Sequence, residues 1–138
     1  MIDEIAIYYE EGIRGIKMTY RYKGREQKKE VLHGSLQGEP QVLKFEEGET
    51  LIGLYVGADE NYIQYLCFET SRGNKLVIGQ KGEYRYFTYK CNETSKIAEV
   101  IGSFTDKLCL IGGETLDISS LRTTEVIVQS NMDYSVII

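Results

Sequence analysis

The chain repeats itself three times, and this repeat limits its fold more than any other feature. Each unit has an apolar strand, a tight turn, a second apolar strand, and then two further strand-like stretches after a longer connection. The hairpins of the three units cover residues 5–20, 51–70 and 97–111. The period is about 42 to 50 residues, as expected for a four-stranded unit. Three such units account for nearly all of the 138 residues.

Alternation of apolar and polar residues identifies the stretches as strands. Ile5, Ile7 and Tyr9 are separated by one residue each, as are Leu66 and Phe68. The composition agrees, because the chain has 15 Ile, 8 Val, 9 Thr and 11 Tyr but only 3 Ala. It also has a single Pro, a residue that cannot donate to a sheet ladder. The sequence therefore predicts an all-β protein.

The connections within each unit predict the architecture. A tight hairpin followed by a longer return to a fourth strand is the connectivity of a Greek key. Propellers use units of this length but normally need at least about four blades. Three small sheets that face one another around a shared apolar core can close with three units, so we expect a prism of three four-stranded sheets.

Length and charge exclude several classes of protein. One domain over residues 1–138 is expected, with 131–138 as an extra strand or a docking tail because this segment ends in apolar residues. The net charge of -5 argues against capture of nucleic acid or anionic lipid. No apolar run approaches the roughly 18 residues of a membrane span.

The cysteines predict a reducing environment. Cys67, Cys91 and Cys109 are odd in number, and Cys67 and Cys109 lie in apolar strand-like runs. A disulfide framework is not expected, and we interpret these residues as small hydrophobic side chains. The first residues also lack a basic stretch followed by an apolar one, so we expect a cytoplasmic location.

Sequence patterns typical of enzymes are missing. His33 is the only histidine, and the chain has no Cys-x-x-Cys pair for zinc or redox chemistry. It has neither a glycine-rich phosphate loop with a following Lys-Ser/Thr nor a Gly-x-Ser-x-Gly turn. We therefore expect no catalytic residues, no metal, no cofactor and no enzymatic activity.

Four phrases, in their order and spacing, resemble the jacalin-related lectins. They are Gly48-Glu49 with Ile52, Leu66-Cys67-Phe68-Glu69-Thr70, His33-Gly34 before a strand, and Val100-Ile101-Gly102-Ser103-Phe104-Thr105-Asp106 leading into Leu110-Ile111-Gly112. The resemblance spans roughly residues 4 to 130. It implies a β-prism I fold, in which three four-stranded Greek-key sheets surround a pseudo-threefold axis.

The resemblance also implies a sugar site. In that family a Gly-x-x-x-Asp loop and a neighbouring glycine-rich loop bind the sugar, and residues 102–106 match the first loop. An ionised Asp106 would accept bonds from sugar hydroxyls, the amides of Ser103 and Phe104 would donate, and the Phe104 ring would pack on the sugar. The predicted site is Gly102, Ser103, Phe104 and Asp106, with an ordinary hairpin turn as the alternative.

Three departures from the family bear on this site. The usual first strand before Ile5 is missing, while about 25 residues follow Gly113, so a circular permutation could supply the strand from the C-terminus. The neighbouring loop, taken as residues 118–124, has no glycine. In the other two hairpins, we expect Arg14 and Gln64 at the position that Asp106 takes in the third hairpin.

Two functions remain open at this point. The first is a lectin-like domain that binds mannose- or galactose-type carbohydrate through the Asp106 loop, either in a homo-oligomer or in a larger assembly. The alternative is a non-catalytic protein-interaction module on a prism that has lost sugar binding. An aromatic face for such a partner could consist of Tyr84, Tyr86 and Tyr89 with Arg85, but the favoured explanation is alternation, which places half of these tyrosines against the core and half on the sheet surface.

Overall fold

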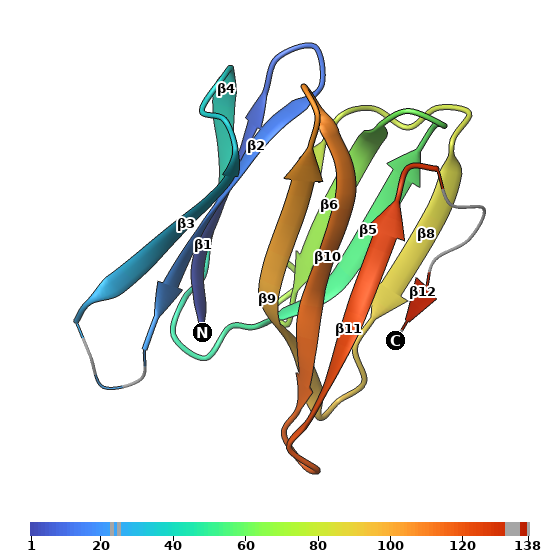
Figure 1. The fold of residues 1–138 in the computed structure, drawn as a ribbon. Coiled ribbons are helices and arrows are strands. Elements are labelled where there is room, and N and C mark those ends of the chain that lie inside the picture. Colours follow the sequence, from blue (N-terminus) through green and yellow to red (C-terminus); the bar gives the residue numbers. More distant parts are fainter. Residues whose placement is uncertain (23, 25, 132–135, 138) are drawn as a thin grey trace.

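The structure is a computed structural model that describes residues 1–22, 24, 26–131, 136 and 137. The described residues form strands and no helix, which confirms the all-β prediction (Figure 1). In the first sheet β1 (Ile2–Tyr9), β2 (Ile13–Arg21), β3 (Lys28–Gly34) and β4 (Glu39–Lys44) lie in the order β3-β2-β1-β4. This is a Greek key, because β4 returns to lie beside β1.

The second sheet repeats this order. Its strands are β5 (Leu51–Ala58), β6 (Ile63–Thr70), β7 (Lys75–Ile78) and β8 (Arg85–Lys90). Here β7 follows β6 outward, and β8 returns to pair with β5. The second unit of the sequence repeat therefore has the same topology as the first.

The third sheet differs at its fourth strand. Its strands β9 (Ser95–Phe104), β10 (Leu108–Asp117), β11 (Arg122–Gln129) and β12 (Val136–Ile137) lie in simple sequential order. Thus β12 pairs with β11 and does not return to β9. The segment 131–138, for which an extra strand or a docking tail is expected, contains β12, and its residues 132–135 and 138 lie outside the described residues.

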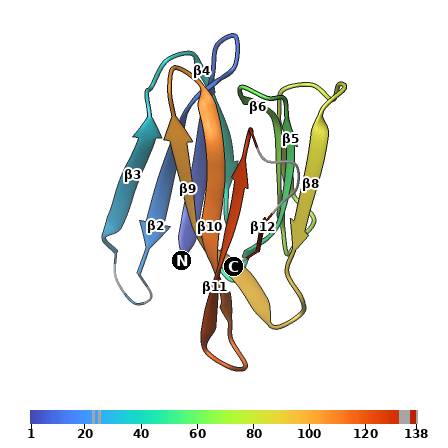
Figure 2. The same ribbon diagram turned by 45° about the vertical axis from the view of Figure 1, so that its right-hand side comes forward.

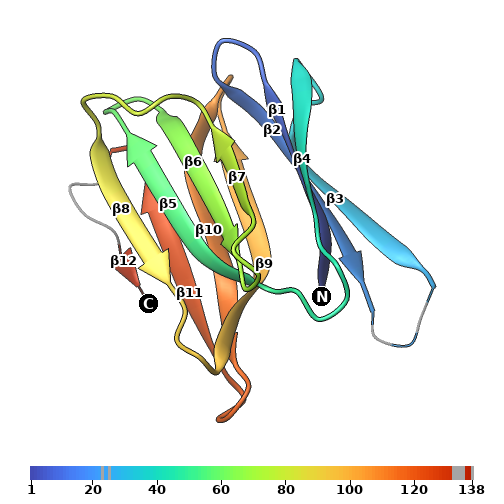
Figure 3. The same cartoon turned by 180° about the vertical axis from the view of Figure 1, so that it is seen from behind.

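Figures 2 and 3 show, from two further sides, how the sheets face one another. Buried apolar side chains from all three sheets form one core. Ile13, Ile63 and Leu108 are fully buried, and each is the first residue after its hairpin turn. The second and third sheets also join through the pairing of Leu51 with Ile97. The other fully buried large side chains are Ile5, Ile7, Ile16, Met18, Leu51, Leu66, Phe68, Ile78 and Ile111.

Three further properties concern the described part of the chain. Cys67, Cys91 and Cys109 all carry free thiols, of which Cys67 is buried. Burial raises the pKa of the Cys67 and Cys91 thiols, which keeps them in the neutral form. Among these residues there is no helix of the length and apolarity needed to cross a membrane, and no group of three metal-binding side chains.

Candidate functional site

The predicted site residues lie together at one end of the molecule. Gly102, Ser103 and Phe104 end β9, and Asp106 lies in the turn before β10. With Thr105, Arg14 and the end of β3 they line an open depression of about 520 Å³. The structure therefore brings all four predicted residues to one surface, and adds Arg14 and Leu32, His33, Gly34 and Ser35 to it.

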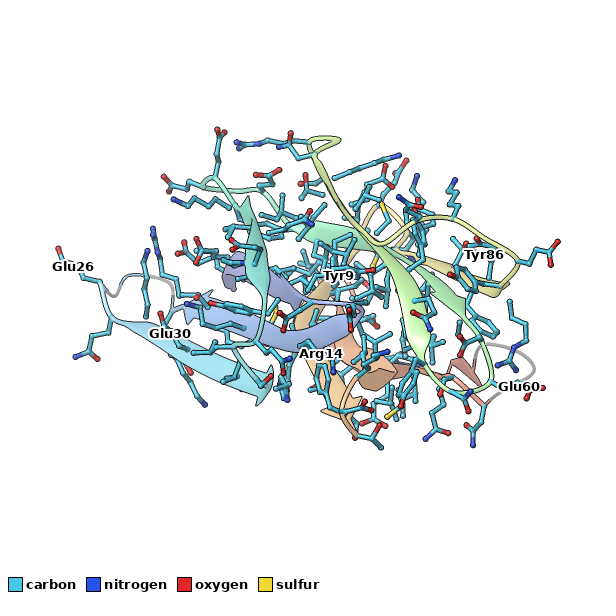
Figure 4. The ribbon with its side chains drawn as sticks, turned by 90° about the horizontal axis from the view of Figure 1, so that it is seen from above. Tyr9, Arg14, Glu26, Glu30, Glu60 and Tyr86 are labelled. Carbon is cyan, nitrogen blue, oxygen red and sulfur yellow. The ribbon has the colours of Figure 1, made fainter. Side chains whose placement is uncertain are left out.

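Asp106 is contacted from the hairpins of the other two sheets, and Figure 1 shows the three hairpins at the same end of the molecule. The Tyr62 hydroxyl, from the β5–β6 turn, donates to Asp106 Oδ1 at 2.7 Å. Arg14, from the start of β2, donates to the Asp106 backbone oxygen at 3.3 Å, and its Nη1 lies 3.9 Å from Oδ2. Figure 4 shows Arg14 beside the β9–β10 hairpin. Tyr62 could not be identified as a site residue from the sequence, because nothing in the sequence distinguishes it from the other tyrosines in turns.

These contacts hold Asp106 in its ionised form. The hydrogen bond from Tyr62 is the main reason that the pKa of Asp106 lies below its usual value. The same bond raises the pKa of Tyr62. The ammonium group of Lys107 lies 5.1 Å from the centre of the Tyr62 ring and adds positive charge beside the carboxylate. Asp106 stays exposed, so it presents an oriented negative charge to a ligand.

The Phe104 ring is less available for packing on a sugar than the sequence indicated. Its ring is half-buried and packs against the core. A Cβ atom added to Gly34 would lie 3.0 Å from the ring, and one added to Gly102 would lie 3.1 Å from it. Both glycines therefore make room for Phe104, and part of its ring faces the protein.

The bulges in the hairpins correct one sequence expectation. Each hairpin has one unpaired residue at the same place: Arg14 between β1 and β2, Gln64 between β5 and β6, and Cys109 between β9 and β10. The backbone confirms this match, because Ser35 N–H donates to Arg14 O and Ser130 N–H donates to Cys109 O, each at 2.9 Å.

The counterpart of Arg14 and Gln64 is therefore Cys109, and the expectation that equated these positions with Asp106 is wrong. Arg14 and Gln64 lie after the turn, at the bulge of the second strand of each hairpin, whereas Asp106 lies before that bulge, in the turn itself. Asp106 instead lies in the middle of a three-residue turn, where the first sheet has Glu11.

The loop expected to face the site is also elsewhere. Residues 118–121 connect β10 to β11 at the opposite end of the sheet (Figure 1). Strand β10 has 10 residues, which separates its two ends by about 30 Å. The glycine-poor loop is therefore too far from Asp106 to contact a ligand there, so its lack of glycine does not affect binding at Asp106. The connection that leaves β11 at the Asp106 end begins with Ser130 and Asn131, and its residues 132–135 lie outside the described residues.

Solved structures of lectins have a similar fold. Artocarpin complexed with methyl-α-mannose aligns with a TM-score of 0.71 and 22 % identity over 83 % of this chain and 82 % of that chain. Wild-type Malaysian banana lectin aligns with a TM-score of 0.65 and 24 % identity over 81 % of this chain and 80 % of that chain. AcmJRL, a mannose-binding jacalin-related lectin from Ananas comosus, aligns with a TM-score of 0.65 and 17 % identity over 78 % of this chain and 76 % of that chain. No curated protein sequence matches the chain.

The family model of the jacalin-like lectin domain matches residues 1–113. The match ends inside β10, so β11 and β12 lie beyond it. This family consists of non-catalytic carbohydrate-binding domains, in agreement with the expectation that the chain is not an enzyme. The family match and the shared fold confirm the resemblance: the chain belongs to the jacalin-like lectin domain family.

Proposed function

We propose that this chain binds carbohydrate in the depression at the β9–β10 hairpin, through Gly102, Ser103, Phe104 and Asp106. The observation that supports it most is the convergence of these residues on one open surface around an exposed, ionised carboxylate. Membership of a carbohydrate-binding family supports the same function.

The chemistry of the depression suits a polyhydroxylated ligand. Asp106 Oδ2 accepts hydrogen bonds from sugar hydroxyls, and the Arg14 guanidinium donates to sugar oxygens on the same side. Such bonds replace bonds between sugar and water, so each adds about 0.5 to 1.5 kcal/mol, or up to about 3 where a charge takes part. A shallow site with a few of them should bind a monosaccharide with a Kd of about 1 mM.

Mannose is the first sugar to test. Artocarpin was solved with methyl-α-mannose, and AcmJRL is described as mannose binding. Galactose differs from mannose in the orientation of two hydroxyls and is the matched comparison. Because one such site is weak, we also propose that useful avidity requires several copies, in an oligomer or on a larger assembly.

The experiment is an NMR titration of labelled protein with mannose and galactose up to tens of millimolar. The expected result is movement of the Ser103, Phe104 and Asp106 amide signals. The Asp106→Asn variant should lose the charged acceptor and bind at least about tenfold more weakly. Asp117→Asn is the matched control, because Asp117 borders the turn at the other end of β10. Unmoved site signals, or equal shifts in both variants, would remove Asp106 from the function.

The second candidate is a non-catalytic protein-interaction module. It is favoured by the occupation of Asp106 by Tyr62 and by the half-buried Phe104 ring, since both reduce what a sugar can contact. If mannose and galactose leave every signal in place, this function takes precedence.

A further inference from the structure

The turn between β10 and β11 carries the most exposed large apolar side chains among the described residues. Leu121 is 77 % exposed and Ile118 is 59 % exposed, and both belong to this turn, residues 118–121. Figures 1 to 3 show the turn extending beyond the other turns at that end of the molecule. Single exposed apolar residues are common on proteins, but two at the end of one projecting hairpin form an apolar tip.

The backbone of Leu121 has a left-handed conformation, which leucine does not favour. Its φ is +57°. The corresponding turns of the other two sheets have glycine in this conformation, with Gly24 at +77° between β2 and β3 and Gly73 at +80° between β6 and β7. Because the Leu121 side chain is mostly exposed, burial within this chain does not compensate for the strain. A leucine kept at such a position indicates a contact outside the chain.

Asp117 closes the apolar tip from inside the chain. Its backbone oxygen accepts from Leu121 N–H at 2.8 Å, and its carboxylate accepts from Ser119 N–H at 2.9 Å. The pKa of this carboxyl group is lowered by the Ser119 hydroxyl first, and further by the N–H groups of Ser119 and Ser120. Three of the four N–H groups of the apolar tip are therefore bonded to one residue at its base.

The remaining N–H group of the apolar tip is also bonded within the chain. Ile118 N–H donates to Thr94 O, in the turn between β8 and β9, at 2.8 Å. The side chains of residues 118–121 carry no charge. Unbonded N–H groups and charges keep a loop out of lipid, because hydrocarbon offers them no partner. The apolar tip has neither obstacle.

The small size of the apolar tip decides which partner it fits. Stable protein interfaces bury about 800 Å² on each partner, whereas two large aliphatic side chains supply only about 120 to 240 Å². A fluid bilayer needs no complementary surface, and binding to it scales with the apolar area that enters. The net charge of -5 disfavours an anionic lipid surface, so the fitting bilayer is zwitterionic.

We propose that the turn between β10 and β11 inserts Ile118 and Leu121 into the interface of a zwitterionic phospholipid bilayer. The apolar tip lies at the end of β10 away from Asp106, so this contact is separate from the proposed sugar site and does not rest on it. Two aliphatic side chains bind lipid more weakly than a myristoyl chain, whose association constant is about 10⁴ M⁻¹. Half of the protein should therefore be bound at about 1 to 10 mM lipid.

Tryptophan fluorescence tests the insertion directly, because the chain has no tryptophan of its own. The Leu121→Trp variant is titrated with phosphatidylcholine vesicles up to tens of millimolar lipid. We expect its emission to shift to shorter wavelength as the indole leaves water. Val77→Trp is the matched control, because Val77 is 46 % exposed on β7 and its variant should show no shift. An unshifted Leu121→Trp, or equal shifts in both variants, overturns the proposal.

The Leu121→Asn variant separates a role in the fold from a role in lipid binding. Asparagine adopts the left-handed conformation more readily than leucine, so the melting temperature should stay the same or rise. Cosedimentation with the same vesicles should weaken at least about tenfold relative to the wild-type protein. A loss of stability in this variant would show that Leu121 packs within the chain, which contradicts the proposal.

Two other outcomes would overturn the proposal. Binding that requires phosphatidylserine in the vesicles and disappears in salt would place the contact on a charged surface. Self-association without lipid that Leu121→Asn removes would mean that a second copy covers the apolar tip. Mannose binding should be unchanged in all of these variants, so failure of the insertion and failure of the sugar site remain distinguishable.

Discussion

The hydroxyl of Tyr62 donates to Asp106 Oδ1 at 2.7 Å and so joins the hairpin turns of the second and third sheets. The bond does two things at once. It orients the carboxylate that is proposed to bind sugar, and it lowers the pKa of that carboxylate.

Tyr62→Phe should therefore raise the pKa of Asp106 towards its usual value, because the variant removes the main group that stabilises the charge. Sugar binding through the ionised form is complete above the usual pKa of Asp and is lost as the pH falls through the lowered value. In the variant, this loss should begin at a higher pH. Carbon-13 NMR titration of the carboxyl group measures the pKa, and an unchanged pKa in the variant would contradict the assigned cause.

Glu49 should make stability depend on pH. This buried carboxylate accepts bonds from Glu46 N–H at 3.0 Å, from Asn74 Nδ2 at 2.7 Å and from the Thr70 hydroxyl. The Thr70 bond is the main reason that its pKa is lowered. Because the folded pKa is depressed, the contribution is present above about pH 4.5, the ordinary value, and is lost as the pH falls through the folded value.

Glu49→Gln should thus reduce the free energy of unfolding at pH 7 by about 1.5 to 3 kcal/mol, because these are hydrogen bonds to a charged group. The difference from wild type should shrink in acid. Urea unfolding at pH 7 and pH 3 measures both values. Glu47→Gln, at an exposed neighbouring position, is the control and should change little.

Gly79 should tolerate no side chain. Its φ is +80°, and an added Cβ would lie 2.2 Å from the backbone oxygen of Gln64. Gly73 has the same φ but nothing within 4 Å of an added Cβ. Gly73→Ala should therefore cost about 1 to 2 kcal/mol from the backbone alone. Gly79→Ala should lower the free energy of unfolding by at least about 1 kcal/mol more than Gly73→Ala, because the backbone around Gly79 must move. Equal melting temperatures of the two variants would contradict this prediction.

Strand β11 should be essential for folding, although the family match ends before it. Truncation after Asp117 removes Val126 and Val128, which are 3 % and 2 % exposed, and leaves the edge of β10 unpaired. The loss of these two side chains alone costs about 3 to 6 kcal/mol, a large part of the stability of a small domain. The truncated protein should be insoluble or melt without cooperativity. Cooperative melting at the wild-type temperature would mean that no permuted strand is needed.

Periodicity made most of the fold predictable. Alternation fixes which side chains of a strand face inward, so the burial of Ile5, Ile7 and Ile16 could be read from the sequence. The threefold repeat predicted the three hairpins, and the structure buries the first residue after each turn, Ile13, Ile63 and Leu108. The residues 102–106 could likewise be placed in one turn, because they are neighbours in the chain.

Only the tertiary structure decided which residues from different sheets meet. A bulge adds one residue to a strand without any mark in the sequence, so the equivalence of Arg14, Gln64 and Cys109 required the observed registers. The contact between Tyr62 and Asp106 joins residues that are 44 positions apart. The sequential order of β9 to β12, in which β12 pairs with β11, also differs from the order in the first two sheets without any mark in the local pattern of a strand, because strand pairing joins residues far apart in the chain.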